Sequence, residues 1–183
     1  MSTLKVNEVQ NTSGTKILTV GVSRTTEAGA LSGATNYDFT LPSNCFRVDF
    51  VGHNVSTSGS GTPSFRMGTS AGILSGSSQY NYVEASSGSS SEGTYRSEGQ
   101  IRPLNFNVNG SGDITDFHFT FTSSSASNFW TFFGRGNRRT SGNVLNCEGN
   151  ADLGGNALTT IRFFPYGTGF DQGRFSYTAY HTV

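Results

Sequence analysis

The sequence carries little charge. Only 13% of its 183 residues are Asp, Glu, Lys or Arg, and the formal net charge is +0, whereas about a quarter of the residues in a typical soluble domain are charged. This balance provides no basic surface for nucleic acid or for an anionic membrane, so neither is expected as a partner. A surface so poor in charge is typical of a protein that functions within an assembly, because net charge keeps a free monomer soluble.

Long apolar runs and closely spaced cysteines are also lacking. No apolar segment approaches the roughly 20 residues of a transmembrane helix. Residues 1–6 lack the apolar core of a signal peptide, which predicts a protein made in a cytoplasm. Cys45 and Cys147 are the only cysteines, and they show no CxxC spacing. A disulfide between them is one alternative; two buried free thiols are the interpretation that a reducing compartment favours.

Aromatic residues, by contrast, are abundant, with 15 Phe and 7 Tyr, and the sequence also contains 24 Gly. They alternate with polar residues over short segments bounded by Gly, Ser and Asn, which is the period of a β-strand. Phe117, Phe119 and Phe121, for example, are expected to line one buried face. Strands are predicted in segments 3–9, 16–22, 37–41, 45–51, 64–67, 80–83, 94–108 (with a break at Pro103), 116–122, 129–133, 143–147, 158–166 and 175–180.

The final segment, 158–183, is expected to close the fold. Two aromatic strands flank a Gly-rich connection over residues 167–173. They pair as a hairpin or lie in facing sheets, because the connection is long enough for both. Turn signals about every ten residues, with no segment of helical period, predict an all-β, antiparallel β-sandwich with jelly-roll-like character.

The chain is expected to divide into an N-terminal arm, residues 1–34, and a β-sandwich domain, residues 35–183. Residues 24–34 are small and polar and are predicted to form a loop. The strands of the arm have too little apolar surface to fold alone, so the arm is expected to pair with the body, a neighbouring subunit or a larger platform. The expected assembly contacts are the apolar residues Leu4, Val6, Val9, Ile17 and Leu18.

Motifs of known enzymes are missing. The sequence contains no Gly-x-Ser-x-Gly, no Walker A motif, no His-Glu-x-x-His and no Cys/His metal spacing. His53, His118 and His181 lie far apart in sequence, and Asp113 and Asp116 are too few for a calcium site, which needs six or more oxygens. We therefore expect no enzymatic activity, no catalytic residue, no metal and no cofactor.

Two groups of residues are candidates for contact with a receptor or partner. Arg135, Arg138 and Arg139 form a basic cluster in a predicted loop, 134–142, which contacts an acidic neighbour or is simply solvated. Tyr80, Tyr82 and Trp130 lie in aromatic runs. Outward-facing rings of these runs would stack on the apolar faces of sugars, whereas the other rings pack in the core.

The opening residues, Met1-Ser2-Thr3-Leu4-Lys5-Val6-Asn7-Glu8-Val9-Gln10-Asn11-Thr12-Ser13-Gly14, resemble the N-terminal stretch of structural proteins from tailed bacteriophages, especially those of marine bacteria. The end of the chain is similar to the closing segment of the β-sandwich modules in such proteins, through Gly169-Phe170-Asp171-Gln172-Gly173 and the Phe/Tyr strand that follows. The resemblance implies a virion component that is trimeric or otherwise multimeric and is anchored by its N-terminal arm.

These features lead us to expect a non-enzymatic virion protein, as a short tail fibre or host-attachment module with a host surface glycan as its partner. The first alternative is a capsid decoration protein whose arm extends a capsid sheet by strand addition. The second is a carbohydrate-active enzyme on the same scaffold, which requires two carboxylates facing one cleft. A fold does not choose among these functions, because one architecture hosts many activities.

Overall fold

The computed structural model describes residues 9–10, 16–18, 20–28, 31–33, 36–76, 79–87, 92–102, 108–109, 114–123, 129–140 and 142–182. Side chains are described from residue 31 onward, except at positions 92, 97, 108 and 109. These residues form strands and the turns between them, and no helix occurs in these ranges. Accordingly, no helix long and apolar enough to cross a membrane is found in them.

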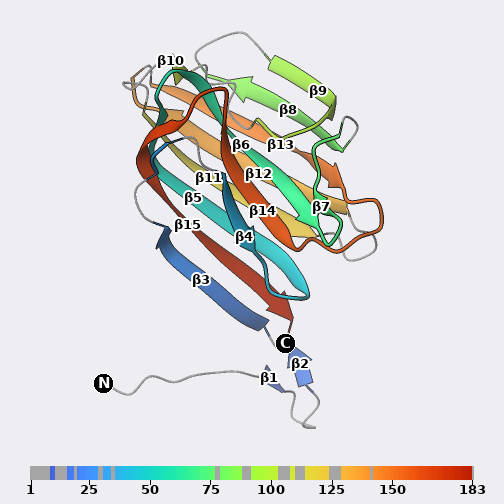
Figure 1. Ribbon diagram of the computed structural model, residues 1–183. Helices are drawn as coiled ribbons and strands as arrows, with labels where there is room; N and C mark the ends of the chain where they lie inside the picture. Colours follow the sequence, from blue (N-terminus) through green and yellow to red (C-terminus); the bar gives the residue numbers. More distant parts are fainter. Residues whose placement is uncertain are drawn as a thin grey trace, which may run out of the picture.

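Most of the strands belong to two antiparallel sheets that lie face to face (Figure 1). The larger sheet has the order β3 (Val20–Ala28), β15 (Phe170–Thr182), β5 (Cys45–Thr57), β11 (Thr115–Ser123), β12 (Phe129–Arg138), β13 (Asn143–Asp152), β8 (Tyr80–Ser86) and β9 (Glu92–Glu98). The smaller sheet has the order β10 (Val108–Asn109), β6 (Ser60–Thr69), β14 (Thr160–Tyr166) and β4 (Tyr37–Thr40), with β7 (Gly72–Ile73) beside β6. A separate two-stranded sheet pairs β1 (Val9–Gln10) with β2 (Lys16–Leu18).

This architecture confirms the predicted all-β sandwich. It also decides between the two arrangements expected for the end of the chain, because β14 belongs to the smaller sheet and β15 to the larger. The jelly-roll-like character is not confirmed. A jelly roll has eight strands in two sheets, whereas the larger sheet alone has eight strands here.

Phenylalanine rings fill the space between the sheets. Phe50 of the larger sheet meets Phe65 and Phe163 of the smaller sheet at ring-centroid distances of 4.9 and 5.2 Å. Phe119 lies 5.3 Å from Phe65 and is completely buried, as is Phe121. Such tilted and edge-to-face contacts add to the free energy gained by burying the rings. The face predicted to be buried on residues 116–122 is therefore confirmed.

The cysteines lie in different strands of the larger sheet and are free thiols. Cys45 on β5 is half-buried and Cys147 on β13 is buried. Burial is the main cause that raises the pKa of both thiols, which favours their protonated form.

Part of the expected arm belongs to the sandwich. Residues 24–28, predicted as loop, continue β3, which pairs along β15 at the edge of the larger sheet. Leu31 is fully buried, and its N–H donates a hydrogen bond to the Gly173 carbonyl at 2.8 Å. The loop prediction failed because β3 gains its hydrogen bonds from a distant strand rather than from local sequence. In the structure β3 pairs with the body, which is one of the three alternatives expected for the arm.

The assembly residues predicted in the arm are only partly described. Leu4 and Val6 lie outside the described residues. Val9 pairs with Leu18 between β1 and β2, and Ile17 lies on β2. The side chains of these three residues are outside the described set, so their role in assembly stays a prediction.

The predicted loop 134–142 is shorter in the structure, and several strands are longer than their sequences indicate. β5 and β6 extend into residues 55–61, β12 runs through Gly134 and Gly136, and β13 runs through Gly149 to Asp152. Gly134 and Gly149 indicate turns in the sequence, but each sits where a side chain has no room. A Cβ on Gly134 would overlap the ring of Phe119, and one on Gly149 would overlap the Asn81 carbonyl oxygen. Glycine within a strand here marks close approach rather than a loop.

Candidate functional site

Strand β12 presents aromatic rings to both sides of the larger sheet. Trp130 and Phe132 face the core and are 2% and 3% exposed. Phe129 and Phe133, which flank these residues in sequence, face outward and are 43% and 53% exposed. Large exposed aromatic side chains carry an apolar surface that core packing does not use, so the outer face of the sheet is a candidate site.

The strand register places polar residues in rows around Phe133. Phe133 lies opposite Glu148 on β13 and Thr120 on β11, and Glu148 lies opposite Val83 on β8. The next row contains Asn81, Asn150, Thr131 and Thr122, and the row on the other side contains Asn146, Arg135 and His118. We call the outer surface made by these three rows the Phe133 face.

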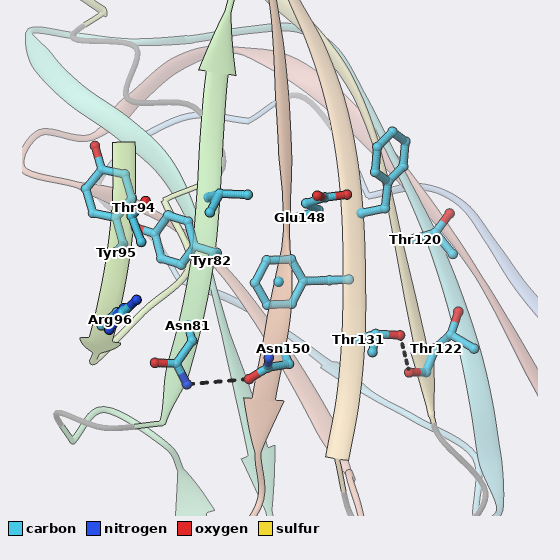
Figure 2. A pocket seen from close by; sticks show the side chains of 14 residues that line it. Asn81, Tyr82, Thr94, Tyr95, Arg96, Thr120, Thr122, Thr131, Glu148 and Asn150 are labelled. Carbon is cyan, nitrogen blue, oxygen red and sulfur yellow. Dashed lines mark hydrogen bonds between the residues drawn. The ribbon is translucent and has the colours of Figure 1, made fainter. Parts of the chain in front are cut away.

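The Phe133 face is hollowed around its central ring. Phe133 lines three neighbouring depressions, which have Val83, Glu148 and Thr120 among their other lining residues. Figure 2 shows the first of them, a shallow groove of about 640 Å³ over β9, β8, β13, β12 and β11, with Thr94 and Arg96 at the β9 side.

Hydrogen bonds hold several polar side chains of the face in place. The Asn81 amide Nδ2 donates to Asn150 Oδ1 at 3.4 Å, and the Thr131 hydroxyl donates to the Thr122 carbonyl at 3.3 Å (Figure 2). The Thr120 hydroxyl donates to Asp49 Oδ1 at 2.9 Å. Amides and hydroxyls retain further donor and acceptor capacity after one such bond, so the rows can hydrogen-bond a polar ligand lying over the ring.

The two carboxylates in the row of Phe133 are not spaced as in a glycosidase. Glu148 and Asp49 stand three strand spacings apart along that row, which is about 14 Å between backbones. Paired glycosidase carboxylates stand closer, at about 5–9.5 Å. Within the described ranges, no group of three or more His, Cys, Asp and Glu side chains could hold a metal ion; Asp113 lies outside those ranges.

The three arginines predicted as one loop cluster do not act together. Arg135 lies on β12 and is exposed on the Phe133 face, Arg138 is half-buried at the end of that strand, and Arg139 begins the turn after it. Arg139 Nε donates to Asp116 Oδ2 at 2.7 Å. Burial alone would raise the pKa of Asp116, but hydrogen bonds from Arg139 and from the Asn54 N–H lower it. Only Arg135 therefore belongs to the candidate site.

The prediction that Tyr80, Tyr82 and Trp130 contact a receptor is wrong, since all three are buried. The Tyr80 hydroxyl accepts from the Met67 N–H at 2.8 Å and donates to the Leu74 carbonyl at 3.2 Å, and burial raises its pKa to about 12. Tyr82 stacks on Tyr95 at 4.7 Å between centroids. Alternation along β8 and β12 directs these rings to the core and leaves the outward positions to their neighbours.

Sequence reasoning missed most of the site. Phe133 lies in one predicted strand, 129–133, and Thr120 and Thr122 lie in another, 116–122, but nothing in the sequence singles these residues out. Alternation along β12 is the signal that would have found Phe133. No local signal brings Asn81, Glu148 and Thr120 onto one surface, because that requires the order of four strands.

No protein-family model matches this chain, and a search of curated proteins finds no match either.

Proposed function

We propose that this chain is a non-enzymatic structural protein of a tailed-phage particle, a host-attachment module whose Phe133 face contacts a host surface glycan. The observation that carries the proposal is Phe133, 53% exposed where three depressions meet and flanked by amide, hydroxyl and carboxylate groups. The resemblance of residues 1–14 to phage structural proteins supports the virion as its location.

The chemistry of the face fits a sugar. A pyranose ring has an apolar face that packs on an aromatic ring and hydroxyl groups at its edge that pair with amides and hydroxyls. The groove is shallow, so one site binds weakly. A trimer or another multimer, as the resemblance implies, would present several copies at once, and multivalent contact raises the overall affinity without new interactions.

Glycan-array binding of the full chain tests this proposal, with bacterial surface polysaccharides as the probes. Phe133→Ala is expected to abolish binding to any polysaccharide that the wild-type chain retains. Phe129→Ala is the matched control, because Phe129 is a similarly exposed ring on the same strand but lines none of the three depressions. Equal binding by wild type and Phe133→Ala, or no retained polysaccharide, would contradict the proposal.

Capsid decoration is a second candidate, favoured by one observation. β3, nine residues long, lies at the edge of the larger sheet beside β15, with no further strand on its other side among the described residues. Such an edge accepts an added strand from another chain. Binding of the purified protein to empty capsids, unaffected by Phe133→Ala, would support decoration over host attachment.

A further inference from the structure

The outer face of the smaller sheet carries a second polar surface, on the opposite side of the sandwich from the Phe133 face. Residues 99–102 lie beside β6, where the Phe65 N–H donates to the Ile101 carbonyl at 2.9 Å and the Ile101 N–H donates back at 3.0 Å. Phe65 and Ile101 are fully buried in the core. Their sequence neighbours Arg66, Gln100 and Arg102 therefore point to the other side of the sheet.

The register adds a third guanidinium to this surface. Arg162 on β14 lies directly opposite Arg66 on β6. We call Arg66, Gln100, Arg102 and Arg162 the arginine patch. Two aromatic rings support it: the Arg66 guanidinium lies 4.7 Å from the Phe164 ring centroid, and the Arg102 guanidinium lies 4.2 Å from that of Tyr166. Stacking of this kind holds arginine side chains in a defined place.

Positive charge exceeds negative charge within the patch. Arg162 is neutralised by Asp38, whose two carboxylate oxygens accept from Nε and Nη2 at 2.7 Å each. Arg66 donates to uncharged acceptors, the Gly99 carbonyl at 3.1 Å and Gln100 Oε1 at 2.9 Å. Neither Arg66 nor Arg102 has a carboxylate partner in the part of the chain described. Burial is the main cause that lowers the pKa of Arg66, and the charges of Arg162 and Arg102 lower it further.

Hydrogen-bond donors also exceed acceptors. Gln100 is 3% exposed, and its Nε2 has no hydrogen-bond partner among the described residues. The same holds for the buried Nε of Arg102, two residues away. Buried donors without acceptors are unfavourable, and charged ones especially so. The patch therefore carries an excess of positive charge, which an anionic ligand would balance, together with two buried donors that have no acceptor among the described residues.

We propose that the arginine patch binds the carboxylate groups of an acidic polysaccharide of the uronic-acid class. A guanidinium fork matches the geometry of a carboxylate and binds it through two parallel hydrogen bonds. Tyr166, 46% exposed beside Arg102, gives a sugar ring an apolar surface next to the charged group. The inference rests on the proposed function in one respect, that the ligand is a glycan, and it assigns a charged contact to the face away from Phe133.

Binding of the full chain to immobilised polygalacturonate tests the proposal. Gln100→Glu is the informative variant, because an oxygen still accepts from Arg66 while the new carboxylate neutralises the patch and replaces the donor Nε2. This variant is expected to lose at least about tenfold in affinity, the equivalent of one charged hydrogen bond, and to keep or raise the melting temperature. Arg102→Gln is expected to lose a similar amount and serves as the test if Gln100→Glu does not fold.

Arg174→Gln is the matched control, since it lowers the net charge by one, as Gln100→Glu does, at an exposed position on β15 that lines none of the depressions of the Phe133 face. Equal losses in Arg174→Gln and the patch variants would reduce the effect to net charge and overturn the proposal. So would the absence of wild-type binding to polygalacturonate, or binding to neutral dextran at equal strength. Tighter binding to poly-glutamate than to polygalacturonate would assign the patch to an acidic protein and overturn the glycan assignment.

The proposals for the Phe133 face and for the arginine patch are tested by different variants, so either can fail without the other. Phe133→Ala is expected to leave polygalacturonate binding unchanged, and Gln100→Glu is expected to leave binding of polysaccharides at the Phe133 face unchanged. Loss of both activities in either variant, with an unchanged melting temperature, would mean that the faces do not act as separate sites and would overturn the assignment of the patch.

Discussion

The two faces of the larger sheet use the same amino acids for opposite purposes. Phe132 and Phe133 are consecutive residues on β12, yet the first is 3% exposed and the second 53%. On the inner face, rings meet rings from the smaller sheet, as Phe119 meets Phe65 at 5.3 Å. On the outer face, Phe133 stands among Thr, Asn and Glu side chains. Position in the alternation, rather than residue type, therefore decides whether an aromatic residue stabilises the fold or is available to a ligand.

The inner face should respond most strongly to truncation. Phe119→Ala is expected to lower the free energy of unfolding by about 3–5 kcal/mol, because the ring is fully buried and leaves a cavity between the sheets. Urea denaturation followed by tryptophan fluorescence measures the change. A loss below about 1 kcal/mol would show that Phe119 does not pack in the core and would remove the contrast between the faces.

Adding a methyl group on the inner face should lower the free energy of unfolding less than removing a buried ring does. Gly134→Ala is expected to destabilise by about 1–3 kcal/mol, because the new methyl group overlaps the Phe119 ring and forces it to move. Gly76→Ala is the control, since a Cβ there meets only Gln79 at 3.8 Å, an ordinary contact. Similar melting temperatures for both variants would contradict the close approach of β12 to Phe119.

The outer face should tolerate the same truncation that the inner face does not. Phe133→Ala is expected to change the free energy of unfolding by less than about 0.5 kcal/mol, as at other surface positions. Phe132→Ala, one residue away, is expected to cost about 3–5 kcal/mol. Urea denaturation of the pair sharpens the comparison, and equal losses would mean that Phe133 is a structural residue.

A similarly small effect is expected at the ion pair at the margin of the outer face. Because the pKa of Asp116 is lowered in the folded protein, its contribution is present above the ordinary carboxyl value of 3.8 and is lost as the pH falls through the folded value. Asp116→Asn is expected to cost about 0.5 kcal/mol at neutral pH, as for other exposed pairs. The difference from wild type should shrink below about pH 4; a difference that persists at pH 2 would assign the loss to packing instead.

The sequence predicted what depends on local alternation. The buried set Phe117, Phe119 and Phe121 follows directly from the two-residue period of a strand, and so does the all-β class. The length of β12 did not follow, because Gly134 and Gly136 indicate a turn, and the ring that needs the space at Gly134 belongs to another strand. The pairing of β3 with β15 did not follow either, since hydrogen bonds between distant strands leave no local pattern.

The binding surfaces were the least predictable part. The Phe133 face draws on β9, β8, β13, β12 and β11, so its composition depends on strand order rather than on any motif. The arginine patch likewise combines residues 99–102 with β6 and β14. Arg66 and Arg162 are ordinary strand residues in sequence, and only the register places them opposite each other. By contrast, Arg138 and Arg139 are adjacent in sequence, yet neither belongs to a proposed binding surface.

The place of β15 between β3 and β5 has a consequence for biosynthesis. When β3 emerges from the ribosome, β15 has yet to be translated, because the partner of Ala28 is Phe175, near the end of the sequence. Pairing between segments so distant in sequence is intrinsically slow. During that delay the backbone N–H and C=O groups of β3 remain unpaired. On a polysome, strands of neighbouring nascent chains can pair with β3 in place of its own β15.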